Sequence, residues 1–532
     1  MDNFTLNVLK RRDAQVGLAI ILFFVVVGTV GAALAPYKNA YNPSSYYVAA
    51  PNALPGWVKL FPAYSKLPTN IILPATYPLQ AFKVPSAVNY WTVTDPGVGG
   101  ANVISSYTAG FGPTGLPNPG ATYTLLNTAN GSELISISGS SDAPVTVYLT
   151  HNFNYTYEPP KMFYAQALVY PAQVDGAGLA VFLFIKSTAG VYPVALMADS
   201  QGEAALESNP QLGSLYVQYF ANPSLPPLTH STWNLLEGIS TASTLMPLAY
   251  LNRSVSVYSV PQSVFSHTGE YTVGELIEVF PHGNYSVRLY QSDIKFQVFG
   301  SVYGLMGTDP HGADVASEYA TSTSIALEIG FGSAAIVMVI GVILGLLAGY
   351  LGGLVDNVLL FVFDFLLLIP GLVLLIDLDT TFTIAHITPN RVLLLIIILG
   401  VLGWAPVSRI VRSQVLTVRS RSYVQAAQAM GGGSMYILRR HILPHTAALI
   451  IALVTYIVPG LVIADAGLDF LSLGITQRPT WGNILSNLIN NMTPTNGYLW
   501  WIFIPVGFSI ILLSVGFYLV GTAIQEEFSR FT

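Results

Sequence analysis

Five predominantly apolar stretches, each of membrane-spanning length, dominate the last 230 or so residues of this chain. A helix that crosses a bilayer needs about 20 such residues in succession. The stretches are Ile329–Val355, Asn357–Ile376, Val392–Ser408, Ala447–Ala464 and Leu499–Ile524. Only 9% of the whole chain is charged, whereas soluble domains carry about a quarter. The C-terminal block is therefore predicted to be an α-helical membrane domain.

A sixth apolar stretch lies at the N-terminus. Lys10, Arg11 and Arg12 precede an uncharged run from Ala14 to Tyr37. A signal peptide has a shorter apolar region of about 7–15 residues before its cleavage site. We therefore interpret the run as a retained membrane anchor, although the small residues 31–35 leave cleavage open.

The distribution of Lys and Arg predicts the orientation, because short cytoplasmic loops are enriched in both. A second basic segment lies between the fourth and fifth of six spans. Its residues are Arg409, Arg412, Arg419, Arg421, Arg439 and Arg440. Six spans place both basic segments and both termini on one side, predicted to be the cytoplasmic face of the plasma membrane.

This topology divides the chain into three parts. Residues 1–36 form the cytoplasmic N-terminus and first helix, residues 37–300 an extracellular insertion, and residues 301–532 a five-helix membrane core. Short runs rich in Val, Tyr, Phe, Thr and Ile, separated by Gly, Pro and Asn, predict a β-rich, sandwich-like insertion. The clearest runs are Val145–Thr150, Met162–Val169, Leu179–Ile185, Leu215–Phe220, Tyr271–Phe280 and Tyr285–Tyr290, the last two joined by a predicted turn at residues 281–284. Residues 36–85, rich in Pro, Tyr and Asn, are predicted to be an extended linker.

The surface of the insertion is predicted to be rich in hydroxyl and amide groups. Four Asn-x-Ser/Thr tripeptides, at Asn130, Asn154, Asn252 and Asn284, are candidate glycosylation sites. Residues 37–300 contain only nine Lys and Arg. One hypothesis is that this part faces an acidic medium; the alternative is an ordinary, tightly folded exported domain.

Several kinds of chemistry are excluded or disfavoured. The chain has no cysteine, which excludes disulfides and cysteine nucleophiles, and its net charge of −6 does not favour nucleic acid as a partner. His441 and His445 are four residues apart, but Pro444 between them is predicted to break the helix, so we expect no metal site. Glu275 and Glu278 have an odd spacing in a strand, which argues against a paired-carboxylate hydrolase. No resident cofactor is expected.

Residues 414–445 form the segment with the clearest functional signal. Tyr423–Met430 is a good helix former, and the glycines at 431–433 end it. Ser434 is predicted to cap a second short helix, which Pro444 ends before the fifth span. The result is a helix–turn–helix elbow joined at both ends to membrane helices, suited to transmit force to a cytosolic partner.

This elbow resembles the EAA loop of ATP-binding cassette (ABC) importer permeases, with Gln425-Ala426-Ala427, Gly431 and Leu443-Pro444 at matching positions. The surrounding sequence resembles the C-type permease of dipeptide and oligopeptide transporters over roughly residues 1–40 and 301–532. The matching residues include Gly307-Thr308-Asp309, Gly345, Gly349, Gly352-Gly353, Asp356, Asp364, Pro370, Trp404, Arg409, Arg412, Asp465-Ala466 and Trp481-Gly482-Asn483. The chain departs from the family at Gln425 (usually Glu), His445 (usually Asn) and Ala313 (usually Arg).

The resemblance implies a type I ABC importer permease fold and a non-catalytic subunit. Residues implied to contact the ATPase are Tyr423, Gln425, Ala426, Ala427, Met430, Gly431, Arg439, Arg440, His441, Leu443 and Pro444; Asp364, Pro370 and Asp465 are implied to line the pathway or pack helices. The implied partners are a second permease subunit, two ATPase subunits that bind ATP and Mg²⁺, an extracellular substrate-binding protein and membrane lipid. The last lysine is Lys295, so no Gly-Lys-Ser/Thr phosphate loop exists in the predicted cytosolic part.

The substrate class stays open between peptides and oligosaccharides. Two other classes of function are also open: a membrane-anchored surface hydrolase with its chemistry in residues 37–300, and a receptor or structural glycoprotein. The elbow argues against both, because neither function needs a cytosolic lever.

Overall fold

The computed structural model describes residues 7–35, 48–75, 89–94, 101–109, 131–188, 190–208, 227–240, 259–368, 373, 377, 381, 390–475, 478–491 and 499–529. The chain forms two compact units. One contains Met1–Ser45 and Ala313–Thr532 and is helical, and the other contains Tyr46–Gly312 and is built mainly of strands. Each is described by itself.

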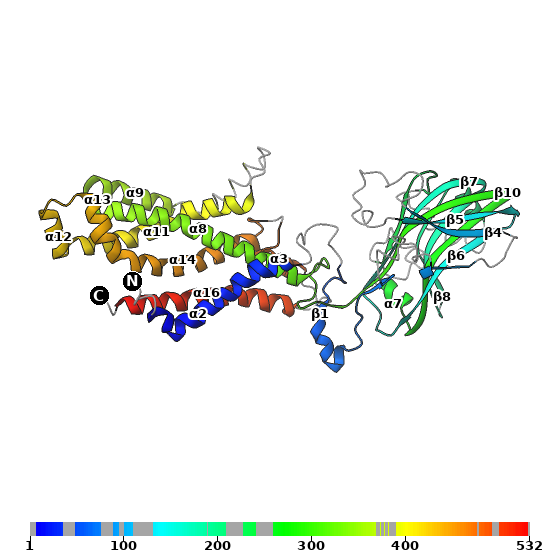
Figure 1. Cartoon of the computed structure of the whole chain (residues 1–532), viewed down its shortest axis with the longest axis horizontal. Helices are drawn as coiled ribbons and strands as arrows, with labels where there is room; N and C mark the ends of the chain where they lie inside the picture. The colour runs from blue at the N-terminus through cyan, green and yellow to red at the C-terminus, as the bar shows by residue number, and fades with distance from the viewer. Residues whose placement is uncertain are drawn as a thin grey trace. The chain divides into compact units, whose positions relative to one another are not determined.

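The helical unit is an array of long apolar helices (Figure 1). Its main elements are α2 (Arg12–Val26), which continues through η1 (Val27–Gly31) and α3 (Ala32–Leu34), α8 (Val315–Leu351), α9 (Gly353–Leu368), α11 (Arg391–Arg419), α14 (Leu443–Phe470), α15 (Trp481–Asn491) and α16 (Trp500–Ser529). Within the described residues, five helices are long and apolar enough to cross a membrane: α2 with its continuation, α8, α11, α14 and α16. The described part of the predicted span 357–376 is α9, which has 16 residues.

Glycines on α8 allow close packing against α11. Gly341, Gly345 and Gly349 recur every fourth residue, so they lie on one face of the helix. A Cβ at Gly345 would lie 2.7 Å from the carbonyl oxygen of Ser408 and 2.8 Å from Cβ of Val411. Small residues at this spacing let membrane helices approach closely, and α8 and α11 therefore form a tight pair.

The start of α2 and the end of α16 lie at the end of the helical unit that also carries α12 (Ser422–Ala429) and α13 (Ser434–Ile437) (Figure 1). Asn7 donates from Nδ2 to Glu527 Oε1 at 3.0 Å, and Arg11 forms an ion pair with Glu526. At the other end, η1 packs on the N-terminal half of α8, because a Cβ at Gly28 would lie 3.1 Å from the backbone nitrogen of Ser324.

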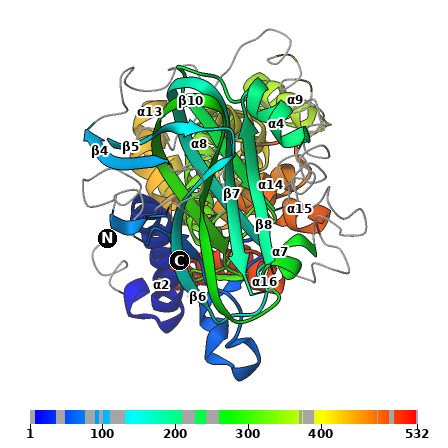
Figure 2. The ribbon, with the colours of Figure 1, turned by 90° about the vertical axis from the view of Figure 1, so that its right-hand side faces the viewer.

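The second unit is a strongly curved, nine-stranded sheet. Its strands are β2 (Ile71–Leu73), β3 (Thr92–Thr94), β4 (Asn102–Ala109), β5 (Gly131–Ser141), β6 (Val145–Tyr155), β7 (Met162–Ser187), β8 (Gly190–Ala198), β9 (Asn234–Ile239) and β10 (Gly269–Phe299). Strands β7 and β10 pair along most of their length and run side by side through the middle of the sheet (Figure 2). The predicted strand 215–220 lies outside the described residues.

The predicted turn at residues 281–284 is wrong. Strand β10 continues through these residues as one element, and the register against β7 shifts between Pro281 and Ser286. Gly283, with φ +82°, accommodates this irregularity, since glycine adopts positive φ without steric cost. The strands expected at 162–169 and 179–185 are likewise one strand, β7.

The predicted linker is also wrong where it is described. Residues 48–75 include β1 (Leu54–Pro55), which pairs with β11 (Val302–Tyr303), and β2, which pairs with β10. Thr308 Oγ1 donates to the carbonyl of Ala50 at 2.6 Å, and Ala50 is fully buried. Asn70 fixes this segment to the sheet, because its side chain donates to the carbonyl of Val48 at 2.6 Å and accepts from the N–H of Gly300 at 2.7 Å.

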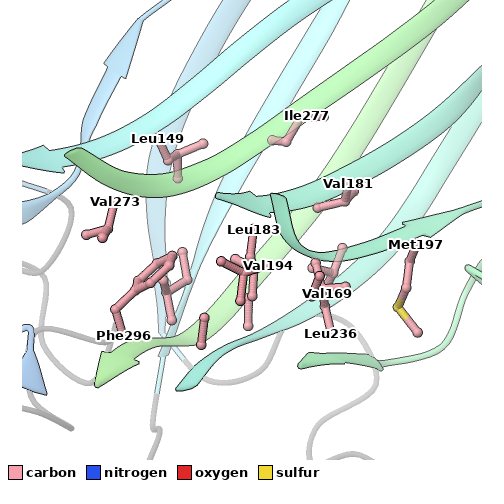
Figure 3. Packing of buried hydrophobic residues seen from close by; sticks show 14 of the residues in the cluster. Leu149, Val169, Val181, Leu183, Val194, Met197, Leu236, Val273, Ile277 and Phe296 are labelled. Carbon is pink, nitrogen blue, oxygen red and sulfur yellow. The ribbon is translucent and has the colours of Figure 1, made fainter. Parts of the chain in front are cut away.

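Apolar side chains on one face of the curved sheet form the core of this unit. Leu149, Val181 and Ile277 meet residues of the other half of the sheet, among them Val169 and Phe296 (Figure 3). All five are 0–3% exposed. Buried and less buried residues alternate along strands such as β6 and β9, so their other side chains lie on the opposite face, outside this core. Among the candidate glycosylation sites, Asn154 and Asn284 are exposed on β6 and β10; Asn130 and Asn252 lie outside the described residues.

Candidate coupling site

The first helix of the elbow, α12, ends in a Schellman motif. Gly431 donates its N–H to the carbonyl of Gln428 at 2.9 Å, and Gly432 donates to that of Ala427 at 3.0 Å, the two reversed bonds that define the motif. Gly431 has φ +84°, which favours glycine. The local sequence therefore ends α12 sharply and reverses the chain.

The second helix does not end at Pro444, contrary to the prediction. Helix α13 continues through a π-helical turn, η9 (Leu438–Ile442), into α14, in which Pro444 lies in the first turn. The wider hydrogen-bond spacing of a π turn accommodates a residue without an N–H. Ser434 is the first residue of α13 and not its cap; the cap position belongs to Gly433, without a side-chain hydrogen bond. The elbow is thus continuous with the fifth predicted span.

Because the helix continues, His441 and His445 lie on one face of it. Tyr423 of α12 stacks on His445, with ring centroids 5.1 Å apart and an interplanar angle of 28°, and its centroid lies 6.3 Å from that of His441. His445 Nδ1 is 2.8 Å from the carbonyl oxygen of His441. The described residues contain no cluster of three or more potential metal ligands. These aromatic contacts join the two arms of the elbow.

The elbow has a buried and an exposed face. Its buried residues, which join the two arms to each other and to the membrane helices, are Val424, Ala427, Ile437, Leu438 and Ile442. On the other face Met430, Met435 and Tyr436 are 83, 65 and 58% exposed. We call these three residues the elbow tip.

The remaining predicted contact residues surround the elbow tip. Gln425, Ala426, Gly431, Arg439, Arg440, Leu443 and Pro444 are exposed, and His441 is half-buried. Gln425 donates from Nε2 to the carbonyl of Ser420 at 3.4 Å. No acidic residue occurs between Thr380 and Ala464, so this surface is apolar at its centre and basic around it.

Two ion pairs connect α9 to α11, the helix that leads into the elbow. Arg412 binds Asp356 through two hydrogen bonds, Nε to Oδ1 at 2.5 Å and Nη2 to Oδ2 at 2.6 Å. Asp364, predicted to line the pathway or pack helices, pairs with Arg409. A charge inside an apolar span needs such a partner. Both arginines were expected to belong to the loop, but they lie within α11.

The other predicted pathway residues are separate from the elbow. Asp465 lies near the C-terminal end of α14 and is 3% exposed. Pro370 lies outside the described residues.

Reasoning from the sequence missed the ion pairs and the Tyr423–His445 stack. The signal for the pairs was present, since two aspartates in one apolar segment and two arginines in another must find partners. The stack had no such signal, because it depends on the helix continuing through Pro444.

Comparisons with known proteins agree with this architecture. Residues 341–530, which include the elbow, match the profile of the binding-protein-dependent transport system inner membrane component. The oligopeptide transport system permease protein OppC of Bacillus subtilis is 31% identical over 221 residues, 41% of this chain and 69% of that protein. The chain therefore belongs to this family of inner membrane transport components and is a multi-pass membrane protein.

Two further relatives are also permease proteins of peptide transport systems. The dipeptide transport system permease protein DppC of Bacillus subtilis is 35% identical, covering 41% of this chain and 66% of that protein. OppC of Escherichia coli is 32% identical, covering 39% and 66%. Among solved structures, the family 11 carbohydrate-binding module of cellulase Lic26A-Cel5E of Clostridium thermocellum aligns over 40% of this chain and 89% of its own, at 12% identity and a TM-score of 0.19, a score too low to assign a shared fold.

Proposed function

We propose that this chain is the permease subunit of an ABC importer that takes up oligopeptides or dipeptides, and that it forms half of the transmembrane pathway. The observation that carries this proposal is the exposed elbow within a stretch similar to OppC and DppC. An apolar tip with more than half of each side chain exposed is unusual on a soluble surface unless it binds a partner.

The proposed topology has six spans in a type I importer fold, with both termini and the elbow in the cytoplasm. The chain crosses outward through α2 and α3, inward through α8, outward through α9 and the residues after it, inward through α11, outward through α14 and inward through α16. The elbow, the start of α2 and the end of α16 lie at one end of the helical unit (Figure 1), which supports this path. Residues 37–300, a sandwich-like domain, then lie outside the cell.

In the proposed mechanism, the elbow transmits motion between two proteins. Each of two ATPase subunits, which bind ATP and Mg²⁺, holds one elbow, and closure of the ATPase pair moves the membrane helices between inward-open and outward-open states. The continuous helix from Ser434 to Phe470 supports this role, because a helix without a break transmits displacement along its whole length. Ion pairs of α11 with α9 connect the same motion to a third helix.

The proposed assembly contains a second permease subunit, the two ATPases and an extracellular substrate-binding protein, in contact with membrane lipid. Gln425 lacks the charge usual at its position, so contact with the ATPase there depends on hydrogen bonding. The β-rich unit has the role of docking the binding protein or supporting the partner permease. A surface hydrolase is disfavoured because Glu275 points into the core and Glu278 lines the opposite face.

A charge at the elbow tip tests the proposal. Met430→Glu places a carboxylate at the exposed apolar centre, and we expect loss of ATPase binding and of ATP-dependent peptide uptake with normal insertion into the membrane. Leu305→Glu, at an equally exposed leucine (76%) of the other unit, is the matched control. Normal copurification of the ATPase with the Met430→Glu protein would contradict the proposal.

A further inference from the structure

The face of the sheet opposite the core contains a hollow of about 710 Å³, a size typical of sites for small ligands. Its floor is formed by neighbouring strands β3, β6, β10, β7 and β8. Helix α4 (Ser200–Ser208) contributes Leu206 to its wall. The residues that line this hollow do not belong to the main core of the unit, which other residues of the same strands form.

One half of the floor is a regular array of hydroxyl and amide groups. Strand β6 presents Thr146, Tyr148, Thr150 and Asn152 to the hollow, each two residues from the next and therefore on one face. Thr94 of β3 lies beside Tyr148, and Thr272 of β10 lies beside Asn152. From Thr146 to Asn152 the array extends about 20 Å along β6. This is the length of about four linked sugar rings.

A hydrogen bond within this array fixes the orientation of the Asn152 amide. Thr272 donates from Oγ1 to Asn152 Oδ1 at 2.8 Å, which leaves the amide hydrogens of Asn152 directed elsewhere. Gly274 lies between Thr150 and Phe184 in the register. Its lack of a side chain is required there, since a Cβ would lie 2.1 Å from the carbonyl oxygen of Leu149. The floor is therefore flat between the hydroxyl half and the aromatic half.

The other half of the floor is apolar and aromatic. Phe182 and Phe184 of β7 lie beside Leu276 and Gly274 of β10, and the rings of Tyr148 and Phe184 meet edge to face with centroids 6.1 Å apart. Helix α4 closes one end, because Gly202 packs directly against the backbone of Leu179. Glu278, which is 7% exposed, also lines the hollow, as does the exposed Lys186 beside Thr272, so the lining carries one charge of each sign.

A ligand that fits must present hydroxyl groups along one edge and apolar faces along another. Sugar rings have this character, with hydroxyls around the ring and C–H groups on its faces that pack on aromatic rings. A peptide does not fit as well, because its backbone amides need a strand edge, and this is a sheet face on which side-chain hydroxyls dominate. We propose that the hollow binds an uncharged oligosaccharide of about four sugar residues.

Such a ligand has two sources: a solute that the complex transports, or a glycan of the cell surface that positions this unit. In the first case the inference rests on the proposed function and adds an oligosaccharide to the substrates of the importer. In the second it is independent of transport. Binding itself does not depend on the elbow, so the two proposals can fail separately.

The test measures binding of maltotetraose, cellotetraose, xylotetraose and mannotetraose, with tetra-alanine as the peptide alternative. The full chain is used in lipid nanodiscs without glycolipid, because sugar-headed detergents would compete, and binding is followed by calorimetry. A Thr150→Val, Thr272→Val double variant removes two hydroxyls and keeps β-branched shape. Thr232→Val, at an exposed threonine of the same unit outside the lining, is the matched control.

We expect at least one tetrasaccharide to bind to the wild-type chain. Its affinity should be at least tenfold lower for the double variant and unchanged for the Thr232→Val protein. A second variant, Tyr148→Ala, should weaken binding similarly, and an unchanged circular dichroism spectrum checks folding. Absence of sugar binding, equal affinity of both threonine variants, or binding of tetra-alanine alone would overturn the proposal.

Uptake of the bound sugar by cells then distinguishes the sources. Uptake that falls in the double variant identifies a transported solute; absent uptake with intact ATPase binding identifies a surface glycan. The Met430→Glu protein should bind sugar normally, so loss of transport through the elbow is separable from loss of the hollow.

Discussion

Three glutamates of the β-rich unit are buried in the folded chain, and we expect them to make this unit more stable in acid than at neutral pH. Glu133, Glu275 and Glu278 are 0, 0 and 7% exposed. Burial raises the pKa of Glu133 and of Glu278 to about 7. The pKa of Glu275 is raised well above its ordinary value, first by burial and then by the charge of Glu133.

The direction in which stability changes with pH follows from proton binding. A carboxyl group whose pKa is higher in the folded chain binds its proton more tightly there, so the free energy of unfolding falls as pH rises from the unfolded to the folded pKa. For Glu133 and Glu278 that window runs from 4.5 to about 7. Each pKa unit corresponds to about 1.4 kcal/mol, which gives about 3 kcal/mol for each group, a large fraction of the stability of a typical domain.

The perturbation is Glu133→Gln combined with Glu278→Gln, which removes two titrating groups and keeps the side-chain size. The assay is urea unfolding of the full chain between pH 4.5 and 7.5, read by brief proteolysis and mass spectrometry of β10 peptides. The wild-type unfolding free energy should fall by several kcal/mol over this range, and that of the variant should fall much less. Glu158→Gln, at an exposed position, controls for net charge.

A wild-type stability that is constant or rises from pH 4.5 to 7 would refute the reasoning. His151 has a pKa lowered by burial and acts in the opposite direction below about 6.5, so the decisive quantity is the difference between variant and wild type. An acid optimum would support the hypothesis, drawn from the hydroxyl-rich surface, that this unit faces an acidic medium.

Three further predictions concern the helical unit. Gly431→Ala, at φ +84°, should lower the free energy of unfolding by about 1 kcal/mol and reduce ATPase stimulation in the reconstituted complex. Gly433→Ala, at φ −68° with no atom within 4 Å of its Cβ position, should have neither effect. Equal effects of the two variants would contradict the assignment of the Schellman motif. Gly345→Leu should separate α8 from α11 and lower the thermal unfolding temperature in detergent, and an unchanged temperature would show that the helices do not pack closely there. Asp356→Asn should lower the free energy of unfolding by about 2 kcal/mol, because it weakens the charged hydrogen bonds to Arg412. The exchanged pair Asp356→Arg with Arg412→Asp should recover part of this stability in the same unfolding assay. Unchanged stability of the single variant would exclude a structural role for the ion pair.

Much of the candidate site could be predicted because its signals are local. The glycine that ends α12, the small residues of the elbow and the apolar lengths of the spans each depend on neighbours within a few residues or on one helix. The family resemblance adds the proposal of an ATPase partner. It said nothing about residues 37–300.

Hydropathy and residue preferences act over short stretches of chain, so the sequence alone predicts the apolar helices, the basic elbow and the β character of residues 37–300. Three-dimensional contacts were needed to see that β7 and β10 are single long strands, that Pro444 lies inside a continuous helix, and that Asp364 meets Arg409. They also bring threonines from three strands together in one hollow. These features depend on pairing between residues far apart in the chain, and no local pattern specifies which distant partner a strand or a charge will find.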